Sequence, residues 1–200
     1  MTGARKAKKK TEINMKDIFR GELVRIAAMN PEEFGPLMAR WDRDSLRMRL
    51  ADSDPVILFS EKARRTWVEK RIERNESFDF TIRALADDRV VGDIGLDGLR
   101  WIHGDTFVGI ALGDRDDWNK GYGTDAMRLI LRYAFTELNL HRVSLGLFEY
   151  NPRALRSYEK AGFKLEGRMR GTLHREGRRW DDLYMGILRT EWMEKYENDN

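Results

Sequence analysis

The feature that most constrains the fold is a change in the spacing of apolar residues part-way along the chain. Within 78–84 and 90–96 apolar and polar residues alternate, and Asp87-Asp88 separates the two segments as a turn. Alternation of this kind is typical of β-strands, so the two segments predict an antiparallel hairpin. From 121 to 138 the apolar residues instead follow the spacing of an amphipathic helix. We therefore expect a sheet with helices packed on it.

Turn and capping residues place the other elements. Asn30-Pro31 and Asn151-Pro152 are typical helix starts, and Gly162 stands where a helix-ending glycine is expected. The segment 42–59 has no clear period and is expected to be a loop, and the polar end from Thr190 is expected to fray. In order, we expect strand 22–28, helices 31–41 and 61–74, strands 78–84, 90–96 and 106–113, helix 121–138, strand 143–147, helix 152–161 and a hairpin over 163–188. The order indicates an α+β fold, a mixed sheet with helices packed on it.

Composition is compatible with one folded domain. At 200 residues, of which 41% are hydrophobic, the chain has enough material for a core. We expect a single domain at 19–200 and, before it, a basic flexible tail at 1–18 that contains the basic run from Arg5 to Lys10. The 37 Lys and Arg residues nearly balance the 34 Asp and Glu residues, which argues against a surface built for nucleic acid.

Some chemistries are excluded or disfavoured by what the sequence lacks. It contains no cysteine, which excludes disulfides, thiolate metal ligands and a cysteine acyl intermediate. His103, His141 and His174 are far apart and match no metal-binding motif, so no metal site is expected. No apolar stretch approaches the roughly 20 residues of a membrane span. We expect a cytoplasmic protein with no membrane partner.

The segment 116–124 is the most informative for function. It lies between an apolar strand and the long helix, and it contains Gly121 and Gly123 next to Lys120. The first amides of a helix lack partners and carry the positive end of the helix dipole, so a phosphate can bind there. Glycine allows close approach of an anion, although glycines at such a turn can also serve packing alone. Neither a Rossmann fingerprint nor a P-loop is present.

This segment resembles the signature of the GCN5-related N-acetyltransferases (GNAT), Gln/Arg-x-x-Gly-x-Gly/Ala. Here it reads Trp118-Asn119-Lys120-Gly121-Tyr122-Gly123, with Trp118 in place of the usual Gln or Arg. With an aromatic residue at this position, the segment resembles the branch of the family that includes ribosomal-protein N-acetyltransferases and spermidine acetyltransferases. The stretch 151–163 resembles a second family motif, Asn-x-x-Ala/Ser-x-x-x-Tyr-x-x-x-Gly-Phe. The specific resemblance covers about 106–163.

The resemblance implies a twisted, mostly antiparallel sheet of about seven strands, splayed between the fourth and fifth and flanked by about four helices. It also implies direct transfer of an acetyl group from acetyl-CoA, a co-substrate, to an amine, without a metal. The pantetheine arm is then expected in the splay, where Asn151 would hold it, and Tyr158 is the candidate general acid. The cofactor-binding residues implied in all are Ile110, Ala111, Leu112, Asn119, Lys120, Gly121, Tyr122, Gly123, Thr124, Asn151 and Tyr158.

Several alternatives stay open at this point. Tyr158 can also be a buried core tyrosine, and the general base is unassigned, with Asp93, Glu149 and His174 as conceivable groups. The acceptor can be a polyamine, an aminoglycoside-like amine, another small amine or a protein N-terminus. The basic tail and the arginines near the last hairpin suggest a different function, a ribosome- or RNA-associated binding module. A relative that binds the cofactor without turnover, and a homodimer, are both compatible with the sequence.

Overall fold

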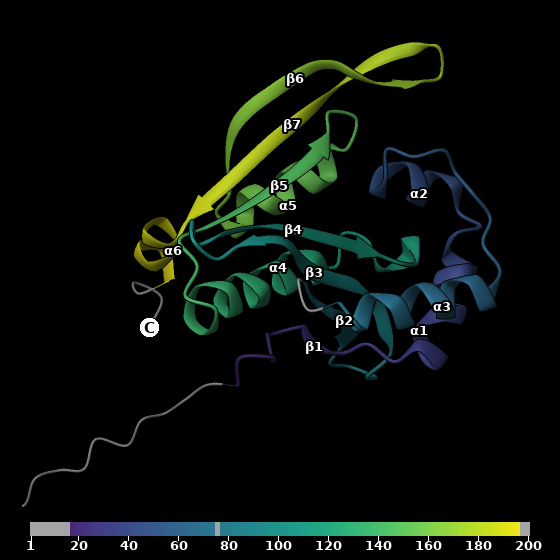
Figure 1. Ribbon diagram of the computed structural model, residues 1–200, viewed down its shortest axis with the longest axis horizontal. Helices are drawn as coiled ribbons and strands as arrows, with labels where there is room; N and C mark the ends of the chain where they lie inside the picture. Colours follow the sequence, from purple (N-terminus) through teal and green to yellow (C-terminus); the bar gives the residue numbers. More distant parts are fainter. Residues whose placement is uncertain (1–16, 75–76, 197–200) are drawn as a thin grey trace, which may run out of the picture.

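The computed structural model describes residues 17–74 and 77–196, so most of the expected basic tail lies outside the described residues. Figure 1 shows the arrangement of the elements. In chain order they are β1 (Val24–Ala28), α1 (Pro31–Trp41), α2 (Ser45–Ala51), α3 (Glu61–Ile72), β2 (Phe78–Ala84), β3 (Val90–Arg100), β4 (Asp105–Leu112), η1 (Arg115–Asp117), α4 (Tyr122–Arg132), η2 (Tyr133–Glu137), β5 (Arg142–Phe148), α5 (Pro152–Ala161), β6 (Lys164–Arg175), β7 (Arg178–Leu188) and α6 (Arg189–Tyr196).

One seven-stranded sheet, in the order β1-β2-β3-β4-β5-β7-β6, runs through the molecule. Its pairs are antiparallel except for β4 and β5, which are parallel. The β4–β5 pairing is short, because it joins only Asp105, Thr106 and Phe107 to the start of β5. Beyond Phe107 the two strands separate (Figure 1). The expected α+β fold and the splay between the fourth and fifth strands are confirmed.

The main core lies between the sheet and α4. Ile94 and Leu96 of β3 pack there in one cluster with Ala126 and Ile130 of α4, and all four side chains are fully buried. Burying apolar area at roughly 25 cal/mol per Å² makes this contact the main source of stability for the sheet. A second cluster, centred on Phe34 and Trp41, includes residues of α1, α3 and β3. The helices thus cover part of the sheet and leave its splay accessible.

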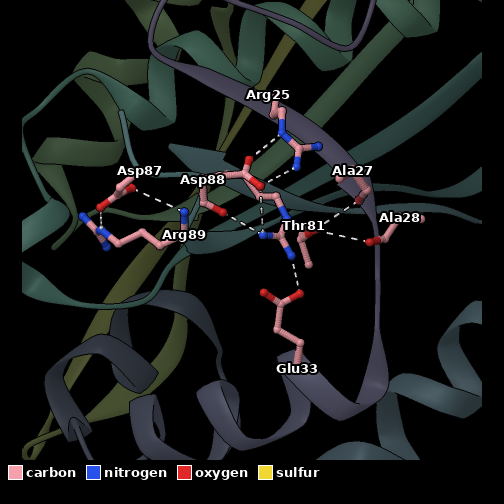
Figure 2. A network of polar contacts seen from close by, with 9 residues as sticks. Arg25, Ala27, Ala28, Glu33, Thr81, Asp87, Asp88 and Arg89 are labelled. Atoms are coloured by element: carbon pink, nitrogen blue, oxygen red, sulfur yellow. Dashed lines mark hydrogen bonds and ion pairs between the residues drawn. The ribbon is translucent and has the colours of Figure 1, made fainter. Parts of the chain in front are cut away.

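A polar network fixes the first strands at the far edge of the sheet, as Figure 2 shows. The guanidinium of Arg25 donates two hydrogen bonds to Asp88, of 2.7 and 2.9 Å. Arg83 pairs with Glu33, which ties the start of α1 to β2. The Thr81 hydroxyl donates to a carbonyl oxygen of β1. These contacts stabilise the β1–β2 edge of the sheet, which lies on the opposite side of β3 and β4 from the splay.

Two short helices were not expected from the sequence. The segment predicted as a loop contains α2, and the end predicted to fray contains α6. Asp44 caps α2 by accepting from the amides of Leu46 and Arg47 at 3.0 and 3.2 Å. The helix buries Arg47 rather than an apolar stripe, which is why its sequence shows no helical period. Its position depends on tertiary contacts.

Candidate active site

A cavity of about 270 Å³ opens where β4 and β5 separate. Its walls come from the end of β4, the turn before α4, the first turns of α5 and one side of α2. Sequence places these elements together because β4 leads through the turn into α4, while β5 leads directly into α5. A parallel pair that separates after three residue pairs therefore has two helix N-termini at its open end.

The turn before α4 presents backbone amides to this cavity. Asn119 and Gly121 have φ values of +63° and +89°, so the chain turns tightly twice within three residues. The Asp125 amide donates to the Gly121 carbonyl at 3.0 Å. The amides of the three residues before Asp125 precede the first helical bond, and no partner for them is found within the described residues. Such a row of free amides at a helix start is suited to an anion.

Gly123 leaves room for a ligand. A Cβ on Gly123 would lie 3.8 Å from the nearest protein atoms, in Leu112 and Ser157, which is ordinary contact. The protein's own packing therefore does not require glycine at this position. An anion bound to these amides would require glycine here, because the anion would occupy the space of a side chain.

A partly buried arginine of α5, Arg153, lines the same cavity. The Arg153 guanidinium stacks on Trp118, with its central carbon 3.5 Å from the ring centroid. The Nη1 atom of Arg153 is buried and lacks a hydrogen-bond partner within the described residues. Burial lowers the pKa of Arg153, which shows that the surroundings give its charge little compensation. The site therefore fits a phosphate-bearing ligand such as coenzyme A.

Tyr158 of α5 lines the cavity. Its ring packs near Phe163, with centroids 6.2 Å apart, and contributes to the edge of the main core. Burial raises the pKa of its hydroxyl to about 12, against the opposing charge of Arg153. No hydrogen bond to this hydroxyl is found in the described part of the chain. The residue is thus packed in place, and its proton remains available for transfer.

Helix α2 forms one wall of the cavity. The Tyr150 hydroxyl donates to the Arg49 carbonyl at 2.7 Å, and Arg47 Nε donates to the Leu112 carbonyl at 3.0 Å. Arg49 also pairs with Glu176 at the tip of the β6–β7 hairpin, at 2.7 Å, and α2 lies opposite this tip in Figure 1. The cavity is consequently bounded by β4, by the turn before α4, by α5 and by α2, and α2 is tied to the tip of the β6–β7 hairpin.

Comparison with known proteins connects this geometry to a family. The model of the acetyltransferase (GNAT) domain matches residues 24–164. The probable N-acetyltransferase YjcK of Bacillus subtilis is 37% identical over 129 residues, which cover 64% of this chain and 71% of that protein. The spermidine N(1)-acetyltransferase of Vibrio cholerae is 29% identical over 128 residues, covering 64% and 73%.

The chain belongs to the GNAT acetyltransferase family. It is an acetyl-CoA-dependent acyltransferase. A crystal structure of spermidine N-acetyltransferase from Vibrio cholerae, in complex with CoA and spermine, has the same fold, with a TM-score of 0.76 at 22% identity. The similarity covers 86% of this chain and 98% of that chain.

Most of the GNAT site residues predicted from the sequence line the one cavity. They are Ile110, Ala111, Leu112, Asn119, Gly121, Tyr122, Gly123, Thr124, Asn151 and Tyr158. Lys120 is not one of the lining residues, and its Nζ lies 3.7 Å from Asp117, which does line the cavity. Asn151 caps α5 by accepting from the Ala154 amide at 3.1 Å, and its Nδ2 faces the Leu50 carbonyl at 3.4 Å.

The sequence analysis missed several residues that line the same cavity of this GNAT domain. Arg47 and Arg153 are two such residues, and they come from α2 and α5. The sequence signal for Arg153 was its place within the second motif, beside Asn151. Arg47 gave no signal, because it lies in a segment predicted to be a loop. Only the tertiary approach of α2 to β4 brings it to the site.

The three groups considered as general base lie in different settings. Glu149 accepts from the Asp181 amide at 3.0 Å and pairs with Arg168, so it stabilises the β5–β7 end of the sheet. His174 lies on the β6–β7 hairpin. Asp93 lies on β3, next to the cavity strand β4. Among the described residues no cluster of three or more metal-ligating side chains exists, and no helix of that part is long and apolar enough to cross a membrane.

Proposed function

We propose that the chain is an N-acetyltransferase that passes the acetyl group of acetyl-CoA directly to a primary amine, with both substrates bound together. The observation that carries this proposal is the continuity of one cavity. The cavity is lined both by the residues before α4 whose amides are free and by Tyr158 of α5. Acetyl-CoA has a diphosphate and a thioester joined by an extended arm, and that order matches the order of these groups.

Direct transfer is supported by the nucleophiles that the site holds. The chain has no cysteine. Ser157 lines the cavity, but its Oγ is bonded to Thr124 Oγ1 at 2.9 Å, and no histidine or carboxylate bonds to either hydroxyl within the described residues. A serine without an adjacent base is a weak nucleophile at neutral pH. The amine itself is therefore the group that attacks the acetyl carbon.

Each part of the cavity has a role in this proposal. The amides from Asn119 to Thr124 bind the diphosphate, with Arg153 as a further cation. The β4 backbone at Ile110 and Leu112 holds the pantetheine arm by strand-like hydrogen bonds. Tyr158 donates its proton to the leaving thiolate, which reduces the charge that develops on sulfur. Acceptors of the proposed class include polyamines, other small amines and protein N-termini.

Two measurements test the proposal. Isothermal titration with acetyl-CoA is expected to show saturable heat, and release of coenzyme A thiol is expected with one of three acceptors: spermidine, an aminoglycoside or a peptide with a free N-terminus. Because the chain has no cysteine, a thiol-reactive dye reports coenzyme A without background from the protein. Heat without thiol release from any acceptor would indicate a binding-only protein. The absence of heat at millimolar cofactor would contradict the proposal.

A further inference from the structure

Among the described residues, one carboxylate next to the cavity has no hydrogen-bonding partner. Asp93 of β3 pairs in register with Ala111 of β4, which lines the cavity. The Asp93 side chain is half-buried, and no hydrogen bond or ion pair reaches it within residues 17–74 and 77–196. Thr81, its neighbour on β2, donates instead to the Ala27 carbonyl at 3.2 Å. An unpaired carboxylate in such a position costs stability and needs an explanation.

Three arginines lie near Asp93, but each is bound to another acceptor. Arg47, Arg64 and Arg71 act on its charge from α2 and α3, and Asp79 acts on it from β2. The bonds of the arginines are Arg47 to the Leu112 carbonyl at 3.0 Å, Arg64 to Asp42 at 2.5 and 2.9 Å, and Arg71 to Asp79 at 2.5 Å. Asp93 is therefore the carboxylate of this group that remains available to a ligand.

Asp93 lies on the face of the sheet that is open at β4 and β5. The next residue, Ile94, packs in the α4 core, so the alternation of the strand places Asp93 on the opposite face. On this face a Cβ at Gly109 would meet no atom within 4 Å, and a Cβ at Gly146 would meet only Tyr184, at 3.9 Å. Two exposed glycines thus leave a shallow floor across the β4–β5 gap. An acceptor can approach the thioester over this floor, from the side opposite α4.

We propose that Asp93 is the general base of the transfer, which binds the ammonium form of the acceptor and removes one proton from it. This inference rests on the proposed function, because it requires an amine as acceptor. Paired strand residues lie about 4.5–5.5 Å apart, so the carboxylate can reach a group lying over Ala111 directly or through one water.

The proton balance is complete with groups on the chain. Asp93 takes one proton from the ammonium and later gives it to solvent. The free amine forms a bond to the acetyl carbon, and the bond from that carbon to sulfur breaks. Tyr158 gives its proton to the thiolate, and the proton lost by the new amide nitrogen restores the tyrosine. The products are the acetylated amine, coenzyme A thiol and one proton.

The electrostatics agree with this role. Burial raises the pKa of Asp93 to about 6, and the positive charges of Arg47 and Arg71 oppose the rise. An acid with this pKa is ionised at pH 7 and yet basic enough to accept a proton. The enzyme is therefore expected to lose activity as the pH falls through about 6, since Asp93 is then protonated.

The test compares Asp93→Asn with Asp97→Asn. Asp97 lies on the same face of β3, is exposed, and accepts from the Gly98 amide at 2.8 Å, so it is a matched control. Spermidine serves as the acceptor, or otherwise the panel amine that the wild type acetylates, and kcat/KM is measured from pH 5.5 to 9.5. Calorimetry with coenzyme A checks the donor site. Thermal melts check folding, and D93N is expected to be at least as stable as the wild type at pH 8, because it removes a buried charge.

For D93N we expect a loss of about 10²- to 10⁴-fold at pH 7, with unchanged affinity for coenzyme A. The loss should shrink by about tenfold per pH unit toward pH 9.5, because an alkyl amine with a pKa near 10 loses its proton unaided. D97N should follow the wild type. An equal loss at every pH, or wild-type activity, would overturn the role of Asp93 alone. A wild type that binds coenzyme A but acetylates no amine would overturn the proposed function as well.

Discussion

At the scale of single residues, burial affects the pKa values of two groups at the site, Tyr158 and Asp93. Burial keeps the Tyr158 hydroxyl protonated far above neutral pH, and it makes Asp93 a stronger base than an ordinary aspartate. A proton donor and a proton acceptor on two sides of one thioester are what amine acetylation needs. Burial is the largest cause of both shifts, and the negative charge of Asp79 adds to the rise in the pKa of Asp93.

Replacing Tyr158 by phenylalanine tests the donor. The substitution keeps the ring contact with Phe163 and removes only the hydroxyl. Because no other donor faces the sulfur in this proposal, kcat should fall by about 10²- to 10⁴-fold, while coenzyme A affinity stays within about twofold. Steady-state kinetics and calorimetry measure the two quantities. Tyr133→Phe, which changes a tyrosine in the aromatic cluster with Phe78, is the control and should leave kcat unchanged.

The pH dependence of this step has a definite sign. Tyr158 is active in its protonated form, and its pKa is about 12. It therefore stays protonated up to about pH 10, and the wild-type rate should show no decline from this group below that value. A decline of kcat with a midpoint between pH 8 and 9 would contradict the assignment of Tyr158 as the acid.

At the scale of elements, the turn before α4 and the turn of the β6–β7 hairpin give a matched pair of substitutions. Gly121 and Gly177 have φ values of +89° and +72°, and alanine at either is expected to cost about 1–2 kcal/mol of unfolding free energy. Gly121→Ala also disturbs the anion-binding amides, so it should weaken coenzyme A binding at least tenfold. Gly177→Ala should leave the affinity unchanged, because Gly177 does not line the cavity and the substitution keeps the Arg49–Glu176 pair that ties this turn to α2. Urea unfolding measures the stability and calorimetry measures the affinity. Equal coenzyme A affinities for the two variants would argue against anion binding by the amides before α4.

Elements with a regular apolar pattern could be predicted from sequence, and those held by polar tertiary contacts could not. The hairpins and α4 carry clear periods, and α5 carries Asn151 as its cap and Gly162 as its end. By contrast, α2 is short, and it is held by the bonds from Tyr150 and Arg47. The same difference applies to the site. The turn around Gly121 and the motif around Tyr158 are local in sequence, whereas the approach of Arg47 to β4 requires the folded chain.

At the scale of the whole molecule, ion pairs make the folding stability depend on pH in the acid range. The Arg115 guanidinium lowers the pKa of Asp44 to about 2, and Arg89 lowers the pKa of Asp117. A carboxyl with a depressed pKa in the folded state stabilises the fold above its ordinary pKa, near 4, and this contribution is lost as the pH falls toward 2. Melting temperatures should thus drop below pH 4. As the pH falls from 8 to 5 they should instead rise slightly, because the raised pKa of Asp93 favours the folded state once that carboxyl is protonated.

The variant Arg115→Gln isolates one of these contributions. Without Arg115, Asp44 loses the largest cause of its lowered pKa and keeps the hydrogen bonds from the Leu46 and Arg47 amides, so the difference in pKa that links it to pH is reduced. The melting temperature of the variant is expected to be slightly lower than that of the wild type at pH 7 and to match it near pH 2. A constant gap between the two proteins at every pH would show that Arg115 acts through packing alone.

Only three residue pairs join the two halves of the sheet through β4 and β5. If the pantetheine arm fills the remaining gap, acetyl-CoA completes the sheet that binds it. At a free acetyl-CoA concentration [L], binding then adds RT ln(1 + [L]/Kd) to the free energy of unfolding. A cell rich in acetyl-CoA would then keep this enzyme folded and out of reach of proteases, and a starved cell would degrade it sooner. The amount of enzyme in the cell would in that way follow the concentration of its acetyl donor.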